Sequence, residues 1–199
     1  MEDNESSGSG GAVWLRTGQL AGGGTIDVAG GTARSGGGGG GRISVILRAS
    51  DSFDSVAMTA YGGEDHFSTR YYGAAGTVYR QTQSQGDGNG ELIVTSYAHA
   101  YTLDWDKLYT EIPAAAEASA AELAHVTLRG LTNCTIGLSQ NLQMHDLYLT
   151  RDDVKLYLNG HTLKLRVPYH DDWGNDSRVD YTGGGQIIWQ QPGTMILLR

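Results

Sequence analysis

The feature that most constrains this chain is a run of six consecutive glycines, residues 36–41, that leads directly into the β-branched segment 42–47. Polyglycine alone is typical of a flexible linker. Here the run lies between segments that look like strands and resemble one another. It therefore indicates a repetitive β architecture in which the chain turns tightly and backbones approach closely. The run ends in Arg-Ile, without the Lys-Ser/Thr of a phosphate-binding loop, so it carries no chemistry by itself.

Short strand-like segments recur along the whole chain. Each is rich in β-branched, aliphatic or aromatic residues, and glycines bound most of those in the first half. In the second half the apolar residues alternate strictly, which indicates strands with one buried face. The predicted strands are residues 12–17, 24–28, 42–47, 56–60, 76–80, 91–95, 126–128, 134–136, 142–144, 147–149, 154–158, 162–165 and 186–189.

These segments also repeat. The matching pairs are 11–17 with 76–82 (spacing 65), 25–31 with 57–63 (spacing 32), and 125–128 with 146–149 (spacing 21). A period near 32 that tightens to 21 suits a solenoid whose early coils carry loop insertions. In such a fold each coil buries its apolar face on its neighbours. The chain is therefore predicted to be all-β, a parallel β-helix with long loop insertions.

The chain is expected to form one domain, because 199 residues are enough for a sizeable core. Residues 1–10 are a polar Gly/Ser leader, which is not a signal peptide. The β-helix domain is predicted over 11–199, with glycine-rich coils over 11–96, an insertion over 97–124 and closing coils over 125–199. Within the insertion, Pro113 and the alanines after it predict a short helix near 113–124.

The dipeptide Asn159-Gly160 leaves two interpretations open. Asn-Gly between apolar segments is typical of a two-residue hairpin turn, and that hairpin would place Leu156 opposite Leu163. The same residues could turn one solenoid coil, since Asn tolerates the left-handed conformation. The repeats elsewhere favour the coil turn.

Composition excludes several classes of function. The net charge is −8 and the chain has no Lys/Arg cluster, so a nucleic-acid footprint is lacking. No apolar run approaches the roughly 18 residues that span a bilayer. Cys134 is the only cysteine, which rules out an intrachain disulfide and a cysteine-based zinc site. It is expected to be a small buried hydrophobe.

The first 95 residues resemble the glycine-rich, right-handed parallel β-helix modules of bacterial exported and surface proteins, which are related in fold to pectate lyases. The resemblance rests on the sequences at 11–17, 24–31, 36–45 and 76–79. The later Leu-x-Leu ladder and residues 159–163 look like the closing coils of the same class. The resemblance implies a right-handed helix and an extracellular or cell-surface location.

The densest polar cluster, residues 169–178, suggests a calcium site. Hard oxygen ligands close together suit Ca²⁺, which takes six to eight oxygens. The candidate ligands are Asp171, Asp172, Asn175 and Asp176. The spacing differs from that of an EF-hand loop, and a solvated, turn-rich loop between the last coils is the favoured explanation of the cluster. No other cofactor is predicted.

The same cluster could carry catalysis. Paired carboxylates beside a basic residue suit glycoside chemistry, and the candidates are Asp171, Asp172 and Arg178. Adjacent carboxylates on an extended segment point to opposite faces, which weakens the pairing. The sequence also echoes only half of the Arg-x-Pro-x-x-Arg pattern of pectate lyases, at residues 166–168.

Aromatic residues suggest a ligand-binding surface, since flat rings can stack on sugars. Packing under the loops is the alternative explanation for them. The candidates are Tyr71, Tyr72, Tyr101, Trp105 and Trp173.

These observations favour a non-catalytic structural, adhesive or assembly module of an exported or cell-surface protein, in contact with glycans. The expected partners are copies of the chain, through head-to-tail or lateral contact that would build filaments, or neighbouring domains of a larger protein. Polysaccharide is a further expected partner, whereas nucleic acid and a membrane span are not expected. The alternative is a polysaccharide lyase or glycoside hydrolase acting in a groove of the β-helix.

Overall fold

The computed structural model describes residues 7–33, 36–64, 72–96, 109–112 and 122–190. Within these residues the chain is built from strands and two short 3-10 helices, so the prediction of an all-β protein is confirmed. The strands are β1 (Ala12–Thr17), β2 (Gly23–Asp27), β3 (Arg42–Leu47), β4 (Ser55–Thr59), β5 (Thr77–Gln81), β6 (Glu91–Val94), β7 (Thr110–Ile112), β8 (Thr127–Gly130), β9 (Cys134–Leu138), β10 (Leu142–Met144), β11 (Asp146–Leu149), β12 (Val154–Tyr157), β13 (Thr162–Leu165), β14 (Val179–Asp180) and β15 (Gln186–Trp189).

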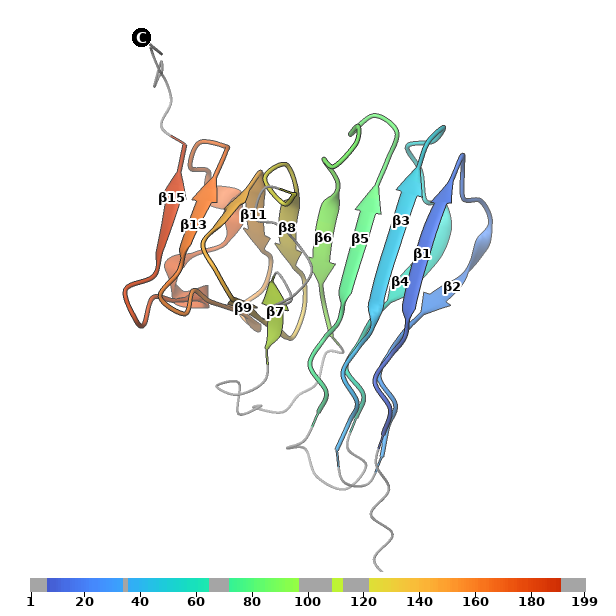
Figure 1. The fold of residues 1–199 in the computed structure, drawn as a ribbon, viewed down its shortest axis with the longest axis horizontal. Coiled ribbons are helices and arrows are strands. Elements are labelled where there is room, and N and C mark those ends of the chain that lie inside the picture. The colour runs from blue at the N-terminus through green and yellow to red at the C-terminus, as the bar shows by residue number, and fades with distance from the viewer. Residues whose placement is uncertain (1–6, 34–35, 65–71, 97–108, 113–121, 191–199) are drawn as a thin grey trace, which may run out of the picture.

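One six-stranded sheet, in the order β1-β3-β5-β6-β8-β11, runs through the molecule (Figure 1). All its neighbouring strands are parallel except β5 and β6, which are antiparallel. Three smaller parallel sheets accompany it: β2-β4, β14-β12-β9-β7 and β10-β13-β15. Strands β2 and β4 lie behind the large sheet as drawn in Figure 1.

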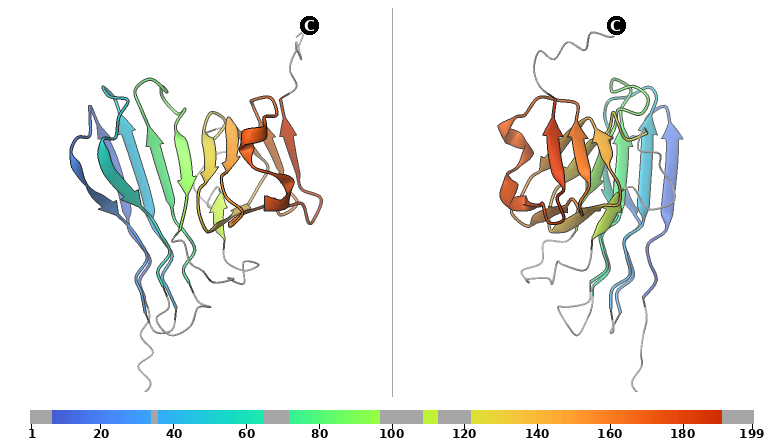
Figure 2. Two further views of the ribbon diagram at one scale, coloured as in Figure 1. Left: turned by 180° about the vertical axis from the view of Figure 1, so that it is seen from behind. Right: turned by 60° about the vertical axis from the view of Figure 1, so that its left-hand side comes forward.

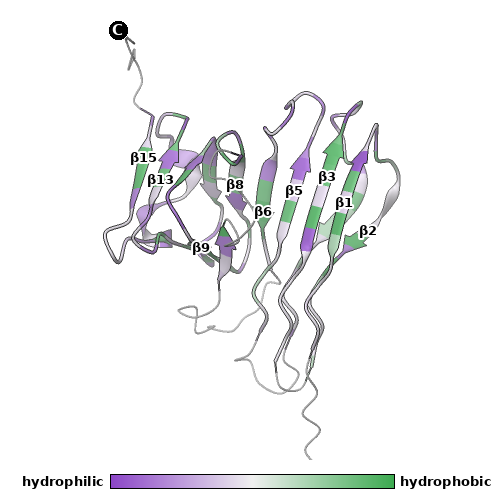
Figure 3. Cartoon of the chain, in the orientation of Figure 1, coloured by the Kyte–Doolittle hydropathy of each residue, from purple (hydrophilic) through white to green (hydrophobic). Residues whose placement is uncertain are grey.

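The two hydrophobic cores lie on opposite faces of the large sheet. Strand β6 shows this directly, because Ile93 belongs to the N-terminal core whereas Leu92 and Val94 pack in the C-terminal core. Successive side chains of a strand point to opposite faces. One side of the first half of the large sheet therefore faces β2 and β4. The opposite side of its second half faces the other two sheets, β14-β12-β9-β7 and β10-β13-β15. Figure 3 shows the alternation of apolar and polar residues along the strands.

The N-terminal strands follow the predicted repeats. Val13 pairs with Ile43, and Ile43 pairs with Val78, so Val13 and Val78 are equivalent positions, as the match of 11–17 with 76–82 predicts. Gly23 pairs with Ser55, in the register that the match of 25–31 with 57–63 predicts. Both spacings were visible in the sequence because the same inward-facing positions recur in each unit.

The glycine-rich segments are not strands but extended chains packed into a bundle below the strands (Figure 1). In chain order the five glycine segments are residues 7–11, 28–33, 36–41, 60–64 and 72–76. The third segment hydrogen-bonds to all four others. The bonds join Gly10 N to Gly39 O (2.8 Å), Gly41 N to Val28 O (2.8 Å), Gly63 N to Gly38 O (2.7 Å) and Gly40 N to Ala74 O (2.9 Å). A strand in a sheet has only two neighbours, so this is a different kind of packing.

Glycine is required inside this bundle by space. A Cβ on Gly38 or Gly41 would lie 2.0 or 1.9 Å from a carbonyl oxygen of the first glycine segment. On Gly37 or Gly40 it would lie 1.8 or 2.1 Å from a carbonyl oxygen of the fourth. On Gly39 it would meet nothing within 4 Å. The direction in which each Cα would carry a Cβ thus repeats every three residues, as in a polyproline-II helix. The third segment is a glycine helix of that type, and two of its three sides pack against the backbone of other segments.

The C-terminal strands follow one route twice. Strands β8, β9 and β10 enter three different sheets, and β11, β12 and β13 enter the same three in the same order, each parallel to its predecessor. The offsets between paired residues are 19 for β8–β11, 20 for β9–β12 and 21 for β10–β13. The offset of 21 proposed for residues 125–128 and 146–149 is therefore wrong by two residues. A two-residue shift keeps every side chain on its face, which is why the pattern alone did not distinguish the registers.

The hairpin alternative at Asn159-Gly160 is wrong. Strands β12 and β13 belong to different sheets and do not pair with each other. Asn159 has a φ of 51° and its amide donates to Leu138 O at 3.0 Å, which fixes this turn against the preceding unit. The chain does contain one antiparallel pair, β5–β6, which the sequence did not reveal. The short strands β7 and β14 were also not predicted.

The predicted helix near 113–124 falls largely on residues 113–121, which lie outside the described residues, while Glu122 to His125 form a turn. Cys134 is buried, and burial raises the pKa of its thiol to about 12. In the part of the chain that is described, no helix has the length and apolarity needed to cross a bilayer.

Two adjacent alanine substitutions test the glycine bundle. Gly38→Ala is expected to lower the free energy of unfolding by about 3 kcal/mol or more, because its Cβ would overlap a backbone oxygen that cannot rotate away. Gly39→Ala is expected to leave stability unchanged or to raise it by up to about 1 kcal/mol, because it restricts the unfolded chain and meets open space. Urea unfolding measures both. Equal losses for the two variants would contradict the three-residue period.

Candidate functional site

The outer face of β11 is covered by the chain between β13 and β14. This insertion, residues 166–178, contains the 3-10 helices η2 (Asp171–Trp173) and η3 (Asp176–Arg178). Seen from behind, it lies on the same side of the large sheet as β2 and β4 (Figure 2, left). Gly174, with a φ of 129°, is needed where the insertion crosses β11, because a Cβ there would lie 2.9 Å from Leu149 O.

The insertion is attached to the sheet through Asp146, which is only 7% exposed although it points away from the C-terminal core. His170 Nε2 lies 2.9 Å from Asp146 Oδ1, and the backbone N–H of Leu147 donates to the same oxygen at 2.8 Å. Tyr148 also hydrogen-bonds to Asp146. Burial and this carboxylate together raise the pKa of the Tyr148 phenol, which therefore stays protonated and donates. A carboxylate can only accept, so His170 donates this hydrogen bond from Nε2.

His170 is the centre of a row of flat side chains, here called the aromatic row: Arg129, Tyr148, His170, Trp189 and Tyr169. The Arg129 guanidinium lies 4.2 Å from the centroid of the Tyr148 ring. Ring centroids are 5.2 Å apart for Tyr148–His170, 5.4 Å for His170–Trp189 and 5.6 Å for Trp189–Tyr169. Tyr169, at the end of the row, is 60% exposed. The row thus links side chains of β8, β11, the insertion and β15.

An ionic network continues from Arg129 across the sheet. Glu91 binds Arg129 Nε at 2.7 Å and Arg80 Nη2 at 3.0 Å, and Arg80 lies 5.7 Å from the centroid of Phe53. Burial alone would raise the pKa of Glu91, but the hydrogen bonds and charges of the two arginines outweigh it and hold this pKa below its usual value. Both arginines thus bind one shared carboxylate, which offsets one of their two positive charges.

The predicted calcium ligands are partly engaged in local hydrogen bonds. Asn175 Oδ1 accepts from the backbone N–H of Ser177 at 3.0 Å and so caps η3. Asp176 accepts from the Tyr181 hydroxyl at 2.7 Å, and Asp171 and Asp172 are exposed in the first turn of η2. Among the described residues no group of three or more His, Cys, Asp or Glu side chains is arranged to hold a metal ion. The calcium site stays a prediction.

Arg178, the predicted basic partner of the two carboxylates, contacts other groups. Its guanidinium binds Asp152 Oδ1 at 2.6 Å and donates to Leu149 O, so it ties the insertion to the turn after β11. Its hydrogen bonds and charge lower the pKa of Asp152.

The aromatic candidates are placed differently from one another. Trp173 is 3% exposed, packs in the C-terminal core, and its ring lies 5.7 Å from that of Trp189. Tyr72 is half-buried. Tyr71, Tyr101 and Trp105 lie outside the described residues.

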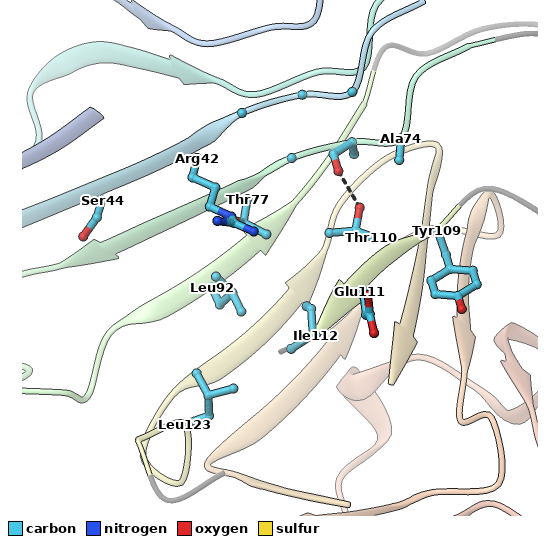
Figure 4. Close-up of a pocket in the computed structure, with 15 residues that line it drawn as sticks. Arg42, Ser44, Ala74, Thr77, Leu92, Tyr109, Thr110, Glu111, Ile112 and Leu123 are labelled. Carbon is cyan, nitrogen blue, oxygen red and sulfur yellow. Dashed lines mark hydrogen bonds between the residues drawn. The ribbon is translucent and has the colours of Figure 1, made fainter. Parts of the chain in front are cut away.

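A hollow of about 710 Å³ lies on the opposite side of the large sheet, between its first half and β7 (Figure 4). One wall is the third glycine segment, and Leu92, Ile112 and Leu123 form the apolar side. Thr110 Oγ1 donates to Ala75 O at 2.6 Å across its edge. Its lining residues Tyr109 and Ile112 flank in sequence the ranges 97–108 and 113–121, which lie outside the described residues. We therefore assign it no ligand.

None of the five residues of the aromatic row was singled out as a ligand contact, although Tyr169 and His170 begin the polar cluster 169–178. Tyr148 occupies an outward position of the predicted strand 147–149 and Arg129 directly follows the predicted strand 126–128, where polar residues are ordinary. The one available signal was Asp146, a carboxylate that begins a strand of otherwise strict alternation. Only the folded insertion shows that this carboxylate is buried.

Compared with protein-family models, with curated proteins and with solved structures, the chain shows no significant match. The functional argument therefore rests on the geometry of this chain.

Removing the shared carboxylate tests the ionic network. Glu91→Gln is expected to lower the free energy of unfolding by about 1–2 kcal/mol at neutral pH, between the values for exposed and buried pairs. Because the folded-state pKa of Glu91 is lowered, its contribution is present above the unfolded pKa of about 4.3 and is lost as pH falls through the folded value. The difference between wild type and variant should therefore shrink below about pH 4.

The control is Asp87→Asn, which removes the more exposed ion pair between Asp87 and Arg48. It should change stability by less than about 0.5 kcal/mol. A Glu91→Gln effect as small as the control, or one that does not change with pH, would contradict the role given to Glu91.

Proposed function

We propose that the chain is a non-catalytic structural, adhesive or assembly module of an exported or cell-surface protein, folded as a right-handed parallel β-helix. The observation that carries the proposal is the stacking of successive units in parallel, with a nearly constant offset between paired residues in the C-terminal half. Units of this kind bury their apolar faces mainly on their neighbours. The right hand is favoured because parallel crossover connections are right-handed in nearly all proteins.

The glycine bundle supports a mechanical role. Each glycine segment is held by backbone hydrogen bonds to its neighbours, and none of these bonds depends on a side chain. A bundle of this type is rigid along its length and extends by adding further segments of the same kind. Most of its residues are glycine or alanine, with Tyr61, Glu64 and Tyr72 among the few larger side chains.

Association is proposed to occur through the ends of the sheets. Within the described residues, β1 and β15 each have one hydrogen-bonded strand neighbour, and they lie at opposite sides of the molecule (Figure 1). Open strand edges pair readily with other chains. Trp14 on β1 is 71% exposed and Ile188 on β15 is 42% exposed, so both edges carry apolar side chains that a neighbouring copy would cover.

Substitutions at the two edges test head-to-tail association. The wild-type chain is expected to associate reversibly with rising concentration in sedimentation velocity. Trp14→Lys and Ile188→Lys should each prevent this, because a lysine blocks either half of the contact. Gln83→Lys, at an exposed loop position, is the control and should behave as wild type. A wild-type chain that remains monomeric at all concentrations would exclude self-association.

A polysaccharide lyase or glycoside hydrolase is the second candidate function, and one contact favours it. Asp146 orients His170 so that Nδ1 could take a proton, which is the arrangement of a general base held by a carboxylate. It ranks second because Arg178 is bound to Asp152 and Leu149 instead of facing the carboxylates.

Product assays decide between the two functions. Incubation with polygalacturonate and with uncharged polysaccharides is expected to yield neither unsaturated products nor new reducing ends. Activity that is lost in both His170→Ala and Asp172→Ala would replace the structural proposal with an enzymatic one. The Thr182→Ala variant, at an exposed turn position, serves as the control.

A further inference from the structure

We propose that the aromatic row is the binding site for an uncharged polysaccharide that lies across the strands of the large sheet. This inference rests on the proposed adhesive role and names the surface and the ligand class that would serve it.

The row differs from the other exposed aromatic residues because its rings are continuous. Trp14 is more exposed than Tyr169, but it stands alone on β1, and single exposed apolar residues are ordinary on protein surfaces. In the row, four rings from three separate parts of the chain follow one another at centroid distances of 5.2 to 5.6 Å, with Tyr148 and His170 tilted at 45° and the other two pairs edge-to-face. A sugar ring has an apolar face of C–H groups and a polar edge of hydroxyls, which matches such an amphipathic surface.

The row is also fixed before any ligand arrives. Asp146 holds both His170 and Tyr148 by hydrogen bonds, and Arg129 is held against Tyr148 by Glu91. Trp189 lies on β15 and packs against the C-terminal core. Ordering of flexible side chains is one of the main costs of binding, so a row built this way binds with little further loss of entropy.

The charges beside the row select an uncharged ligand. Arg80 and Arg129 share Glu91, and Asp146 is bound to His170, so these ionic groups already have partners within the protein. Asp171, Asp172 and Asp176 are exposed acidic side chains at this end, and the chain as a whole has a net charge of −8. A uronate polymer would be repelled, whereas neutral hydroxyls can donate to the same carboxylates.

The direction of the ligand follows from the order of strands. Tyr169, His170 and Trp189 lie beside the β11 end of the large sheet, the row continues over β11 and β8, and the ionic network extends it to β6 and β5. These four strands are neighbours in one sheet, and neighbouring strands are roughly 4.8 Å apart, which is close to the length of one sugar in an extended chain. A polysaccharide running from Tyr169 across this part of the sheet would therefore place successive sugars over successive strands.

Affinity electrophoresis of the full chain tests this inference. The gels contain xyloglucan, mixed-linkage β-glucan, galactomannan or polygalacturonate, each at low and high salt. At least one of the three uncharged polymers is expected to retard the wild-type chain equally at both salt concentrations, and polygalacturonate is expected not to retard it. Tyr169→Ala should weaken retardation roughly three- to tenfold, the value of one aromatic contact.

Tyr109→Ala is the matched control, because it removes a 41% exposed aromatic ring that lies outside both the row and the strand edges, and it should bind as wild type. Circular dichroism verifies that both variants remain folded, which the exposure of both side chains favours. Equal affinities of Tyr169→Ala and Tyr109→Ala would show that the row is not the site. Salt-sensitive retardation by polygalacturonate would overturn the ligand class while leaving glycan adhesion intact. Retardation by none of the four polymers would overturn the inference. The sedimentation of Trp14→Lys and Ile188→Lys would still test the proposed assembly module separately.

Discussion

The whole structure depends on one strand, β6, burying both of its faces. Ile93 completes the N-terminal core, and Leu92 and Val94 on the other face contribute to the C-terminal core. Because β6 is antiparallel to β5 and parallel to β8, it also joins two stacks of parallel strands into one sheet. A polar residue at Ile93 would therefore disturb the first core without touching the second, although both share the same backbone.

The two stacks of parallel strands fill the space between their chains in different ways. In the C-terminal half, leucines and valines fill the space between three sheets, and the turns are fixed by side chains such as Asn159. In the N-terminal half, a smaller apolar core lies between the strands, and in the bundle below them glycine lets backbones pack directly and hydrogen-bond in several directions. Close backbone packing has no tolerance for a Cβ, whereas an apolar core can adjust to moderate changes in side-chain volume.

The proposed binding surface arises where these two stacks share the sheet. The face that is core beside β2 and β4 becomes an outer face over β8 and β11, and Arg80, Glu91 and Arg129 occupy the transition. The insertion then covers Asp146 and brings His170 and Tyr169 beside Trp189. The way in which the insertion closes over β11 thus fixes the rings of this surface and bonds its ionic side chains to one another.

By itself, the sequence determined the strands and their inward faces, because alternation in segments such as 42–47 and 162–165 reflects burial directly. It also determined both spacings of the N-terminal repeats, since equivalent core positions recur there. Only the tertiary structure decided the register of β8 with β11, the reversal at β6 and the burial of Asp146. Each of these depends on contacts between residues far apart in the chain, and local patterns are the same for either outcome.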